Sequence, residues 1–344
     1  MTDKIKALGL LSGGLDSTLA VRIMAELGIK VKAINFSTGF CLTDHHRLLN
    51  RPTDRTFYNE SLRAAQDLDV EIDIIDISQE YKQVLFNPKH GYGAGMNPCL
   101  DCRAYMLFKA RKLMESEGAS FVFTGEVLGQ RPMSQYKQAL KIVEKDAGLE
   151  GLVLRPLSAQ LLDPTIPEIN GWVDRDKLLS ISGRSRKEQI ELAEKLNITD
   201  YPQPAGGCCC LPDENYTRKL KDLMTHRGVD VLGPEDFVLL KVGRHFRFPG
   251  NVKALVGRDE SENNFLERFG EGRMLMESTT HVGPTTLIEG DVTDELLPII
   301  AGITARYGDG VTEPQVTVQY KAADREGEIQ VVPLKPDEYA DYWV

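Results

Sequence analysis

The sequence predicts an α/β domain with a parallel sheet, followed by a smaller α+β domain. Three observations support this prediction. In the first half, short apolar runs alternate with runs of helical periodicity, as in parallel-sheet folds. A glycine-rich loop joins the first of these strands to the first helix. After about residue 228, short β-like runs separated by glycine and proline turns become dominant. The expected parts are 1–200, a cysteine-bearing linker and helix at 201–228, and the α+β domain at 229–344.

Composition and charge exclude several classes of protein. The chain has 344 residues, of which 42% are hydrophobic and 27% charged, as in ordinary globular proteins with two or three domains. No run approaches the roughly 18 apolar residues of a membrane span, and no basic-then-apolar leader opens the chain. We therefore expect a cytoplasmic protein with no membrane partner. The net charge of −10 argues against a generally basic surface, so an RNA partner would need a local basic patch.

The first strand and helix, expected at Ile5–Leu11 and Leu15–Leu27, enclose the most informative loop. Glycines at such a junction let the backbone approach a bulky anion, while the helix dipole and the first-turn N–H groups point at it. The alternative is a glycine-rich turn that merely caps the helix. The loop has neither the Gly-Lys-Ser/Thr ending of a Walker loop nor the Gly-x-Gly-x-x-Gly pattern of a dinucleotide site. Its residues are Ser12, Gly13, Gly14, Leu15, Asp16 and Ser17.

This Ser-Gly-Gly-x-Asp-Ser pattern closely resembles the PP-loop of the ATP pyrophosphatases. The resemblance implies a HUP-like fold in which the loop grips the β,γ-phosphates of ATP together with Mg²⁺. It also implies that Asp16 orients the loop or the Mg²⁺ ion. The residues so assigned to ATP are Ser12, Gly13, Gly14, Asp16 and Ser17.

The strand expected at Ser120–Phe123 leads into a second candidate ATP segment. If this strand lies beside the first, its following loop sits over the nucleotide at the carboxyl edge of the sheet. The stretch Thr-Gly-x-x-Leu-Gly-Gln resembles the tRNA 4-thiouridine synthetases, which places Thr124, Gly125 and Gln130 near ATP. Arg155, in the strand expected at Gly151–Leu157, could contact phosphate or form a structural ion pair. The other elements expected in this domain are strands at Val31–Phe36 and Val70–Ile77, and helices at Thr56–Leu68, Tyr81–Phe86 and Arg103–Glu117.

Six cysteines are unusual for a cytoplasmic chain, where thiols are more often ligands or reactive groups than structural disulfides. Cys99 and Cys102 precede a predicted helix, whose positive end favours thiolates. A glycine-containing linker presents three consecutive cysteines, residues 208–210. Cys41 has no assignable role. It lies in a polar loop with His45 and His46, which we expect to be solvated rather than metal-binding.

The cysteine spacing resembles the iron–sulfur class of tRNA thiolation enzymes. In that class three cysteines hold a 4Fe–4S cluster with one open iron, which assigns Cys99, Cys102 and Cys208 as ligands. The further cysteines at 209 and 210 depart from the family pattern and leave the choice within the triplet open. Two alternatives use the same residues. One is a persulfide mechanism with a resolving cysteine, and the other is a four-thiolate zinc site.

The C-terminal part contains a run of basic and aromatic residues, Lys241–Phe248, with Lys253 and Arg258 nearby. Such a mixture can hold phosphates and stack on exposed bases. The region resembles the NFACT-R-type domains found behind some thiolation domains. The alternative is a hairpin with a solvated basic face. A second basic run, Gly183–Gln189, could meet an RNA backbone or form a solvated helix start. Strands are expected at Phe237–Val242, Arg244–Phe248 and Val252–Val256.

Together these resemblances imply an ATP-dependent sulfurtransferase acting on a uridine of tRNA, with Asp16, Cys99, Cys102 and Cys208 as catalytic residues. The implied cofactors are ATP, Mg²⁺ and the 4Fe–4S cluster, and the implied sulfur source is sulfide or a sulfur-donor protein. The oligomeric state is left open, with a homodimer among the options. Two other functions are retained as alternatives. One is thiolation or amidation of a small molecule, and the other is RNA binding or redox sensing with a vestigial ATP site.

Overall fold

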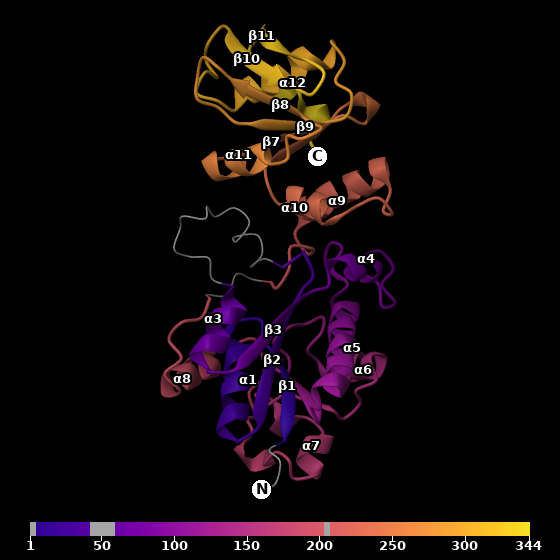
Figure 1. The fold of residues 1–344 in the computed structure, drawn as a ribbon, viewed down its shortest axis with the longest axis vertical. Helices are drawn as coiled ribbons and strands as arrows, with labels where there is room; N and C mark the ends of the chain where they lie inside the picture. Colours follow the sequence, from indigo (N-terminus) through magenta and orange to yellow (C-terminus); the bar gives the residue numbers. More distant parts are fainter. Residues whose placement is uncertain (1–4, 42–58, 203–206) are drawn as a thin grey trace. The chain divides into compact units, whose positions relative to one another are not determined.

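The computed structural model describes residues 5–41, 59–202 and 207–344, which divide into two compact units. In these ranges the first unit ends at Pro212 and the second begins at Asp213. The predicted segment 201–228 is therefore divided, because its cysteines belong to the first unit and its helix to the second. None of the helices in the described ranges has the length and apolar character needed to cross a membrane. Figure 1 shows the two units in the colours of the sequence.

The first unit is built on a five-stranded parallel sheet with the order β3-β2-β1-β4-β5 (Figure 1). The first strand lies at the centre, paired with β2 on one side and with β4 on the other, so the condition that places the loop after β4 beside the first loop is met. The strands are β1 (Lys6–Leu10), β2 (Lys30–Ser37), β3 (Glu71–Asp76), β4 (Phe121–Thr124) and β5 (Val153–Leu154).

The described residues of this unit contain seven helices, of which α7 and α8 follow the last strand. Those that position the candidate site are α1, which follows β1; α5, which precedes β4; and α8, which packs against α1. The helices are α1 (Leu15–Glu26), α3 (Glu60–Asp67), α4 (Ser78–Phe86), α5 (Cys99–Glu117), α6 (Lys137–Ala147), α7 (Ile166–Ile169) and α8 (Lys187–Lys195), with 3₁₀ turns at Ala159–Leu161 and Arg175–Lys177.

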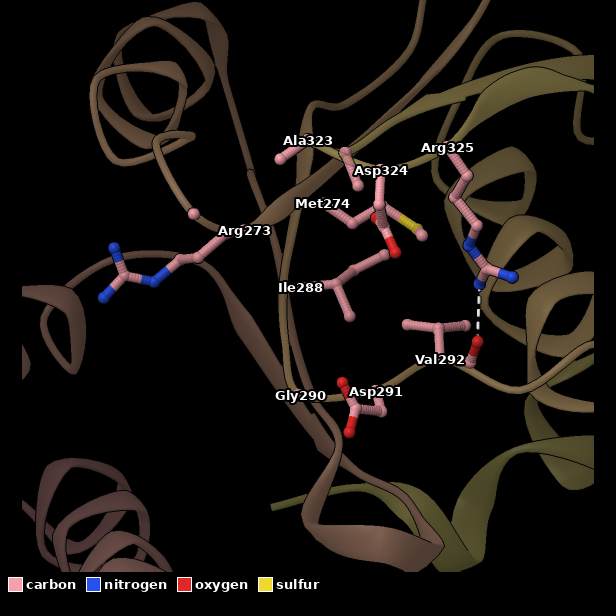
Figure 2. A pocket seen from close by; sticks show the side chains of 11 residues that line it. Arg273, Met274, Ile288, Gly290, Asp291, Val292, Ala323, Asp324 and Arg325 are labelled. Atoms are coloured by element: carbon pink, nitrogen blue, oxygen red, sulfur yellow. Dashed lines mark hydrogen bonds between the residues drawn. The ribbon is translucent and has the colours of Figure 1, made fainter.

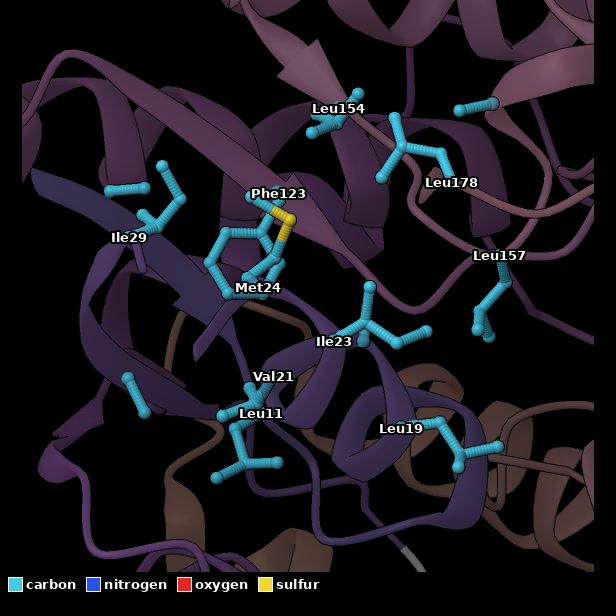
Figure 3. Close-up of a cluster of buried hydrophobic side chains, with 14 of the residues drawn as sticks. Leu11, Leu19, Val21, Ile23, Met24, Ile29, Phe123, Leu154, Leu157 and Leu178 are labelled. Carbon is cyan, nitrogen blue, oxygen red and sulfur yellow. The ribbon is translucent and has the colours of Figure 1, made fainter. Parts of the chain in front are cut away.

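The core of this unit fixes α1 on the sheet. Figure 3 shows Leu19, Ile23 and Met24 of α1 among buried side chains from the strands. The ring of Phe123 in β4 lies against Gly9 in the neighbouring strand β1, since a Cβ at Gly9 would stand 2.5 Å from that ring. The missing side chain in β1 therefore makes room for the ring in β4, and the two central strands are held in register at the point where their loops begin.

The second unit contains a six-stranded antiparallel sheet with the order β11-β10-β8-β9-β7-β6. Its helix α12 packs against β8, β10 and β11. The strands are β6 (Arg244–Arg247), β7 (Lys253–Val256), β8 (Met274–Ser278), β9 (Thr286–Glu289), β10 (Val316–Lys321) and β11 (Glu326–Val331). The helices are α9 (Glu214–Arg227), α10 (Pro234–Leu239), α11 (Glu260–Glu267) and α12 (Leu296–Arg306).

Two predicted elements differ from the structure. The strand expected at Phe237–Val242 is wrong, because its first half, Phe237–Leu239, forms the end of helix α10 and the rest is a turn. Pro234 at the start of α10 and Asp236, whose carboxylate accepts from the Gly233 N–H at 2.8 Å, favour a helix there. The strand expected at Gly151–Leu157 is shorter than predicted, with only β5 paired in the sheet.

Candidate nucleotide and thiol site

The loop between β1 and α1 is closed by its own hydroxyl groups. The Ser12 and Ser17 oxygens lie 3.2 Å apart, and the Ser12 N–H donates to Ser17 Oγ at 3.3 Å. The Ser17 hydroxyl also lies 2.9 Å from the Gly14 carbonyl and donates to it. Because Gly14 caps α1 in an extended conformation without a side-chain bond, the first-turn N–H groups of α1 remain directed at the loop. The loop is therefore a preformed anion cradle.

Gly13 cannot be replaced without disturbing this cradle. Its φ of +80° is a left-handed conformation that other residues adopt only with strain. A Cβ there would also come within 2.3–2.6 Å of Glu60 atoms at the start of α3. At Gly14, by contrast, a Cβ would meet only Ser12 Oγ at 3.5 Å. The space beside Gly14 is thus open to a ligand, whereas the space beside Gly13 is filled by the protein.

Asp16 lies behind the loop with one carboxylate oxygen satisfied and the other not. Gln130 Nε2 donates to Asp16 Oδ2 at 3.0 Å, but Oδ1 is buried without a partner among the described residues. Burial raises the pKa of Asp16, opposed by the hydrogen bond from Gln130 and by the charges of Arg186 and Arg131. A cation bound at Oδ1 would offset the free-energy cost of burying the ionised carboxylate. Asp16 is thus suited to a metal ion that accompanies nucleotide phosphates.

The segment after β4 closes the other side of the cradle. A Cβ at Gly125 would lie 2.5 Å from the Asp16 carbonyl group and the Ser17 nitrogen, so this glycine packs directly on the first turn of α1. Gln130 holds Asp16, as described above. The structure thus brings both residues to the loop, as expected from the sequence. Thr124 is directed elsewhere, because its buried hydroxyl donates to Glu126 Oε2 at 3.1 Å.

Glu126 is the centre of a buried ion network beside this segment. Arg155 Nε donates to Glu126 Oε2 at 3.0 Å, and Arg103 lies 3.8 Å from its other oxygen. Burial would raise the pKa of Glu126, but the charges of Arg155 and Arg103 hold it below its usual value. Arg155 also pairs with Glu144 and is 3% exposed. Of its two predicted roles, the structural ion pair is therefore the one observed.

The first turn of α5 presents two thiols on one side of the helix. Cys99 begins the helix, and Cys102 follows three residues later, so the two face the same direction. Burial raises the pKa of Cys102 to about 12, opposed by a hydrogen bond with Tyr81. The charges of Cys208 and Cys99 also affect the Cys102 pKa. Cys99 and Cys102 thus lie together on the first turn of α5, and the charge of Cys208 acts on Cys102.

The segment 207–211 is held by backbone bonds on both sides. The Cys210 N–H donates to the Phe40 carbonyl at 3.0 Å, and the Leu211 carbonyl accepts from the Met96 N–H at 3.1 Å. Cys208 is exposed, and Cys210 is buried at 7% exposure. A hydrogen bond from the neighbouring Cys209 lowers the pKa of Cys208 well below that of an ordinary thiol, and the charges of Arg103 and Arg131 add to this. Cys208 is thus more acidic than the adjacent Cys209, whose pKa is raised by the same hydrogen bond.

These thiols do not, as placed, form a metal-binding group. Across the described ranges no three His, Cys, Asp or Glu side chains are arranged so that they could hold a metal ion. The donor set is soft, which suits iron–sulfur or zinc chemistry, but the arrangement does not fit either. The predicted loop with His45 and His46 lies outside the described residues.

Several residues near the cradle were not assigned to the ATP site from the sequence. Arg131 is near enough to Asp16 and to Cys208 to lower the pKa of each. Arg186 and Gln189, from the basic run at the start of α8, also act on the Asp16 pKa. Gln189 is fully buried, and neither of its amide atoms has a hydrogen-bond partner among the described residues. Such long-range partners carry no local sequence signal. Their contribution to the site can be recognised only in the folded structure, where α8 packs on α1.

The aromatic residues of the run Lys241–Phe248 are buried inside the second unit, and some of its basic residues form ion pairs there. Phe246 is fully buried and Phe248 is 3% exposed, so neither ring can stack on an RNA base, and that prediction is wrong. Among the basic residues, Arg247 and Lys253 pair with Asp222 at 2.7 and 3.3 Å. The alternation of the strand places the rings toward the core.

A pocket of about 250 Å³ lies on another side of the second unit, between the ends of β8 and β9 and the turn joining β10 to β11. Figure 2 shows Met274, Ile288 and Val292 lining it, with Asp291 and Asp324 close by. The nearby Arg325 donates to the Val292 carbonyl and is therefore already engaged. The carboxylates make this pocket a poor site for phosphate.

Two family models match the chain. Residues 5–163 match the tRNA methyl transferase HUP domain, and residues 243–344 match the NFACT protein RNA binding domain. Among solved structures, a 4-thiouridine synthetase–RNA complex with bound ATP aligns at 20% identity with a TM-score of 0.39. That alignment covers 67% of this chain and 53% of the other.

Curated relatives are similar at low identity. The tRNA-specific 2-thiouridylase MnmA of Petrotoga mobilis is 24% identical over 63% of this chain and 58% of its own length. The enzyme of the same name from Thermotoga maritima is 28% identical over 70% of this chain and 65% of its own length. The chain thus spans less than two thirds of these relatives. The first unit, with its glycine loop and five-stranded parallel sheet, is thus similar to HUP domains, and the second unit is similar to NFACT-type RNA-binding domains.

Proposed function

We propose that this protein is an ATP-dependent sulfurtransferase that thiolates a uridine of tRNA. The observation that carries the proposal is the attachment of the cysteine triplet to the segment after β2, through the Cys210 N–H and the Phe40 carbonyl at 3.0 Å, beside the strand that leads into the phosphate cradle. Adenylation of a carbonyl oxygen and sulfur attack on its carbon act on one carbonyl group, so the ATP site and the sulfur carrier have to lie close together. The charge of Arg131 acts on both Asp16 and Cys208, which agrees with this arrangement.

The cradle performs the first step. ATP binds with its β,γ-phosphates against the N–H groups of the loop and α1, with Ser12 and Ser17 as further donors. Asp16 would hold Mg²⁺ through the carboxylate oxygen that has no partner among the described residues, and the ion would neutralise charge on the phosphates. A uracil carbonyl oxygen attacks the α-phosphorus, the bond to pyrophosphate breaks, and the charge that develops on pyrophosphate is stabilised by these fixed donors. The carbonyl oxygen becomes part of an adenylate and can then leave as AMP.

A sulfur nucleophile performs the second step at the activated carbon. Sulfur adds to the carbon, the bond to the adenylate oxygen breaks, and AMP departs. Cys208 is the best-placed carrier among the described thiols, since it is exposed and acidic. A persulfide on Cys208, formed by transfer of sulfane sulfur from the persulfide of a sulfur-donor protein, gives the attacking sulfur. The product of the attack is joined to Cys208 through a disulfide. Cys99 or Cys102 of α5 then attacks the Cys208 sulfur, forms a disulfide with it and releases the thiouridine, and an external thiol reduces that disulfide.

The tRNA substrate is supported by two findings. The second unit matches an RNA-binding domain, and relatives of the chain bear the name of tRNA-specific 2-thiouridylases. A small-molecule substrate would not explain why the second unit resembles an RNA-binding domain. The carbonyl that is replaced, at position 2 or 4 of the uracil ring, is decided by product analysis.

The test measures pyrophosphate release from ATP and Mg²⁺ with and without bulk tRNA, and then thionucleosides in the digested tRNA. We expect tRNA-dependent release and one thiouridine in the presence of a sulfur donor. Asp16→Ala should abolish both, whereas Glu194→Ala, an exposed carboxylate on α8, should change neither. Cys99→Ser should retain pyrophosphate release and lose thiolation. Release that is independent of tRNA would reject the tRNA substrate and favour a small-molecule acceptor.

The predicted 4Fe–4S cluster on Cys99, Cys102 and Cys208 remains a prediction with a separate test. Protein purified without oxygen is assayed for iron and acid-labile sulfide. About four of each per chain would replace the persulfide carrier with an open-site cluster. Zinc would make the cysteines structural, and absence of metal together with turnover would support the persulfide.

A further inference from the structure

Cys41 and Cys209 face each other across two short backbone segments. Cys41 follows β2, and Cys209 is the middle residue of the cysteine triplet, yet the two form an antiparallel bridge. The backbone bond beside them runs from the Cys210 N–H to the Phe40 carbonyl, at 3.0 Å. That bond joins the residues flanking the pair rather than the pair itself. Cys41 and Cys209 are therefore a non-hydrogen-bonded pair, the kind in which side chains come closest.

The spacing of such a pair suits a disulfide. Cα atoms of a non-hydrogen-bonded antiparallel pair lie about 4.5 Å apart, and disulfides span about 4.4–6.8 Å between Cα atoms. The two side chains also project from the same face of the paired segments. A bond between the two sulfurs thus requires rotation of side chains rather than movement of the backbone.

The local contacts hold both thiols at this junction without joining them. Cys41 Sγ lies 3.5 Å from Thr38 Oγ1, and Cys209 Sγ lies 4.0 Å from Asn97 Oδ1. Both residues are partly exposed, so a small reagent can reach them. The neighbouring cysteines have other surroundings. Cys210 is buried, and Cys208 is exposed near Arg103 and Arg131.

We propose that Cys41 and Cys209 are a redox-active pair that closes into a disulfide, separate from the thiols proposed for sulfur transfer. The oxidant is a low-molecular-weight disulfide such as oxidised glutathione. One thiolate of the pair attacks it, forms a mixed disulfide and releases one reduced thiol. The second thiolate attacks the pair's own sulfur, forms the Cys41–Cys209 bond and releases the other reduced thiol. Two protons and two electrons leave the pair, and one small disulfide is reduced.

Closure would tie the segment that carries Cys208 to the end of β2. In the open form this attachment depends on backbone bonds at Phe40 and Met96. A covalent bond at Cys209 restricts the neighbouring Cys208 and leaves its sulfur as a thiol. The pair would thereby couple the redox state of the surroundings to the freedom of the reactive thiol.

The experiment incubates the full-length protein in buffers with graded ratios of oxidised to reduced glutathione. Remaining thiols are alkylated under denaturing conditions, and each cysteine is quantified by peptide mass spectrometry. We expect the labelling of Cys41 and Cys209 to fall in parallel along one redox curve, with recovery of a linked peptide that lacks two hydrogens. Cys210→Ser is the matched control and should give the same curve, since the Cys210 backbone N–H that bonds Phe40 is unchanged.

Replacing either partner tests the pairing directly. In Cys41→Ser the linked peptide must vanish, and Cys209 should instead carry a mixed disulfide with glutathione. Should a variant fail to fold, the wild-type labelling curves still decide the matter. A Cys41 that stays fully alkylated at every ratio, or a disulfide between Cys208 and the α5 cysteines in place of this one, would overturn the proposal. No ATP or tRNA is present, so the outcome is independent of the proposed thiolation activity.

Discussion

Gly125→Ala offers a quantitative test of how the segment after β4 supports the phosphate cradle. The added Cβ would stand 2.5 Å from backbone atoms of Asp16 and Ser17, whereas ordinary contacts begin near 3.4 Å. The first turn of α1 would therefore have to move by roughly 1 Å, because these backbone atoms cannot rotate away as a side chain could. Overpacking of this kind costs about 1–3 kcal/mol.

This free-energy cost appears either in the affinity for ATP or in the stability of the free protein. If the folded protein keeps its shape until ATP binds, the affinity for Mg²⁺–ATP falls by about 5- to 150-fold, at about 1.4 kcal/mol per tenfold. If the strain is released in the free protein, the thermal midpoint of the first unit falls by about 2–4 °C for each kcal/mol. Titration calorimetry with a non-hydrolysable ATP analogue and differential scanning calorimetry measure the two effects on the same sample.

The control is Gly207→Ala, where a Cβ would meet its nearest atom at 3.5 Å and the backbone needs no left-handed conformation. It should bind the analogue and melt as the wild type does. A Gly125→Ala protein indistinguishable from wild type in both affinity and melting would refute the packing argument. It would mean that the first turn of α1 yields to the methyl group at no cost.

Three further outcomes are expected. Arg155→Met should destabilise the first unit by about 3–5 kcal/mol in urea unfolding, because buried carboxylates lose their counter-charge, and adding Glu126→Gln should recover part of that loss. Phe246→Ala should cost about 3–5 kcal/mol in the same assay, as for a fully buried ring, and a cost below 1 kcal/mol would restore a surface role for this residue. Glu117, whose pKa is lowered to about 2 by hydrogen bonds from Lys32 and from a second lysine, should stabilise the protein at neutral pH, and this contribution should disappear as the pH falls from about 4.5 to 2. The difference in urea midpoint between wild type and Glu117→Gln should therefore be present at pH 7 and absent at pH 2.

The elements that could be predicted from the sequence are those with a strong local signal. The buried strand, the glycine loop and the helix around Asp16 follow from apolar periodicity within some twenty residues. The position of the segment after β4 was expected on the condition that β4 lies beside β1, and the two strands do pair. Helix α6 was not predicted, although Leu140 and Val143 have helical spacing on its buried side, because the polar residues around them obscured the pattern.

The rest of the site could not be predicted, because it depends on partners distant in the sequence. Arg155 is equally suited to phosphate or to a carboxylate until the fold brings Glu126 beside it. Phe246 sits among basic residues in the sequence, but strand alternation directs its ring inward. No local sequence pattern assigns a role to Cys41, because its pairing partner Cys209 lies 168 positions away in the sequence.

One feature of the first sheet bears on how this protein can be altered. Lys32 is 7% exposed and its ammonium lies 2.8–3.3 Å from Glu117, Asp73 and Glu71, at the edge of the sheet where the strands begin. The phosphate cradle lies where the strands end, about 15 Å away along β1. Substitutions separated by more than about 10 Å are usually additive. Substitutions that raise thermal stability can therefore be confined to the Lys32 edge, while substitutions that change substrate preference are made at the opposite edge. A gain in stability at one edge then need not reduce activity at the other.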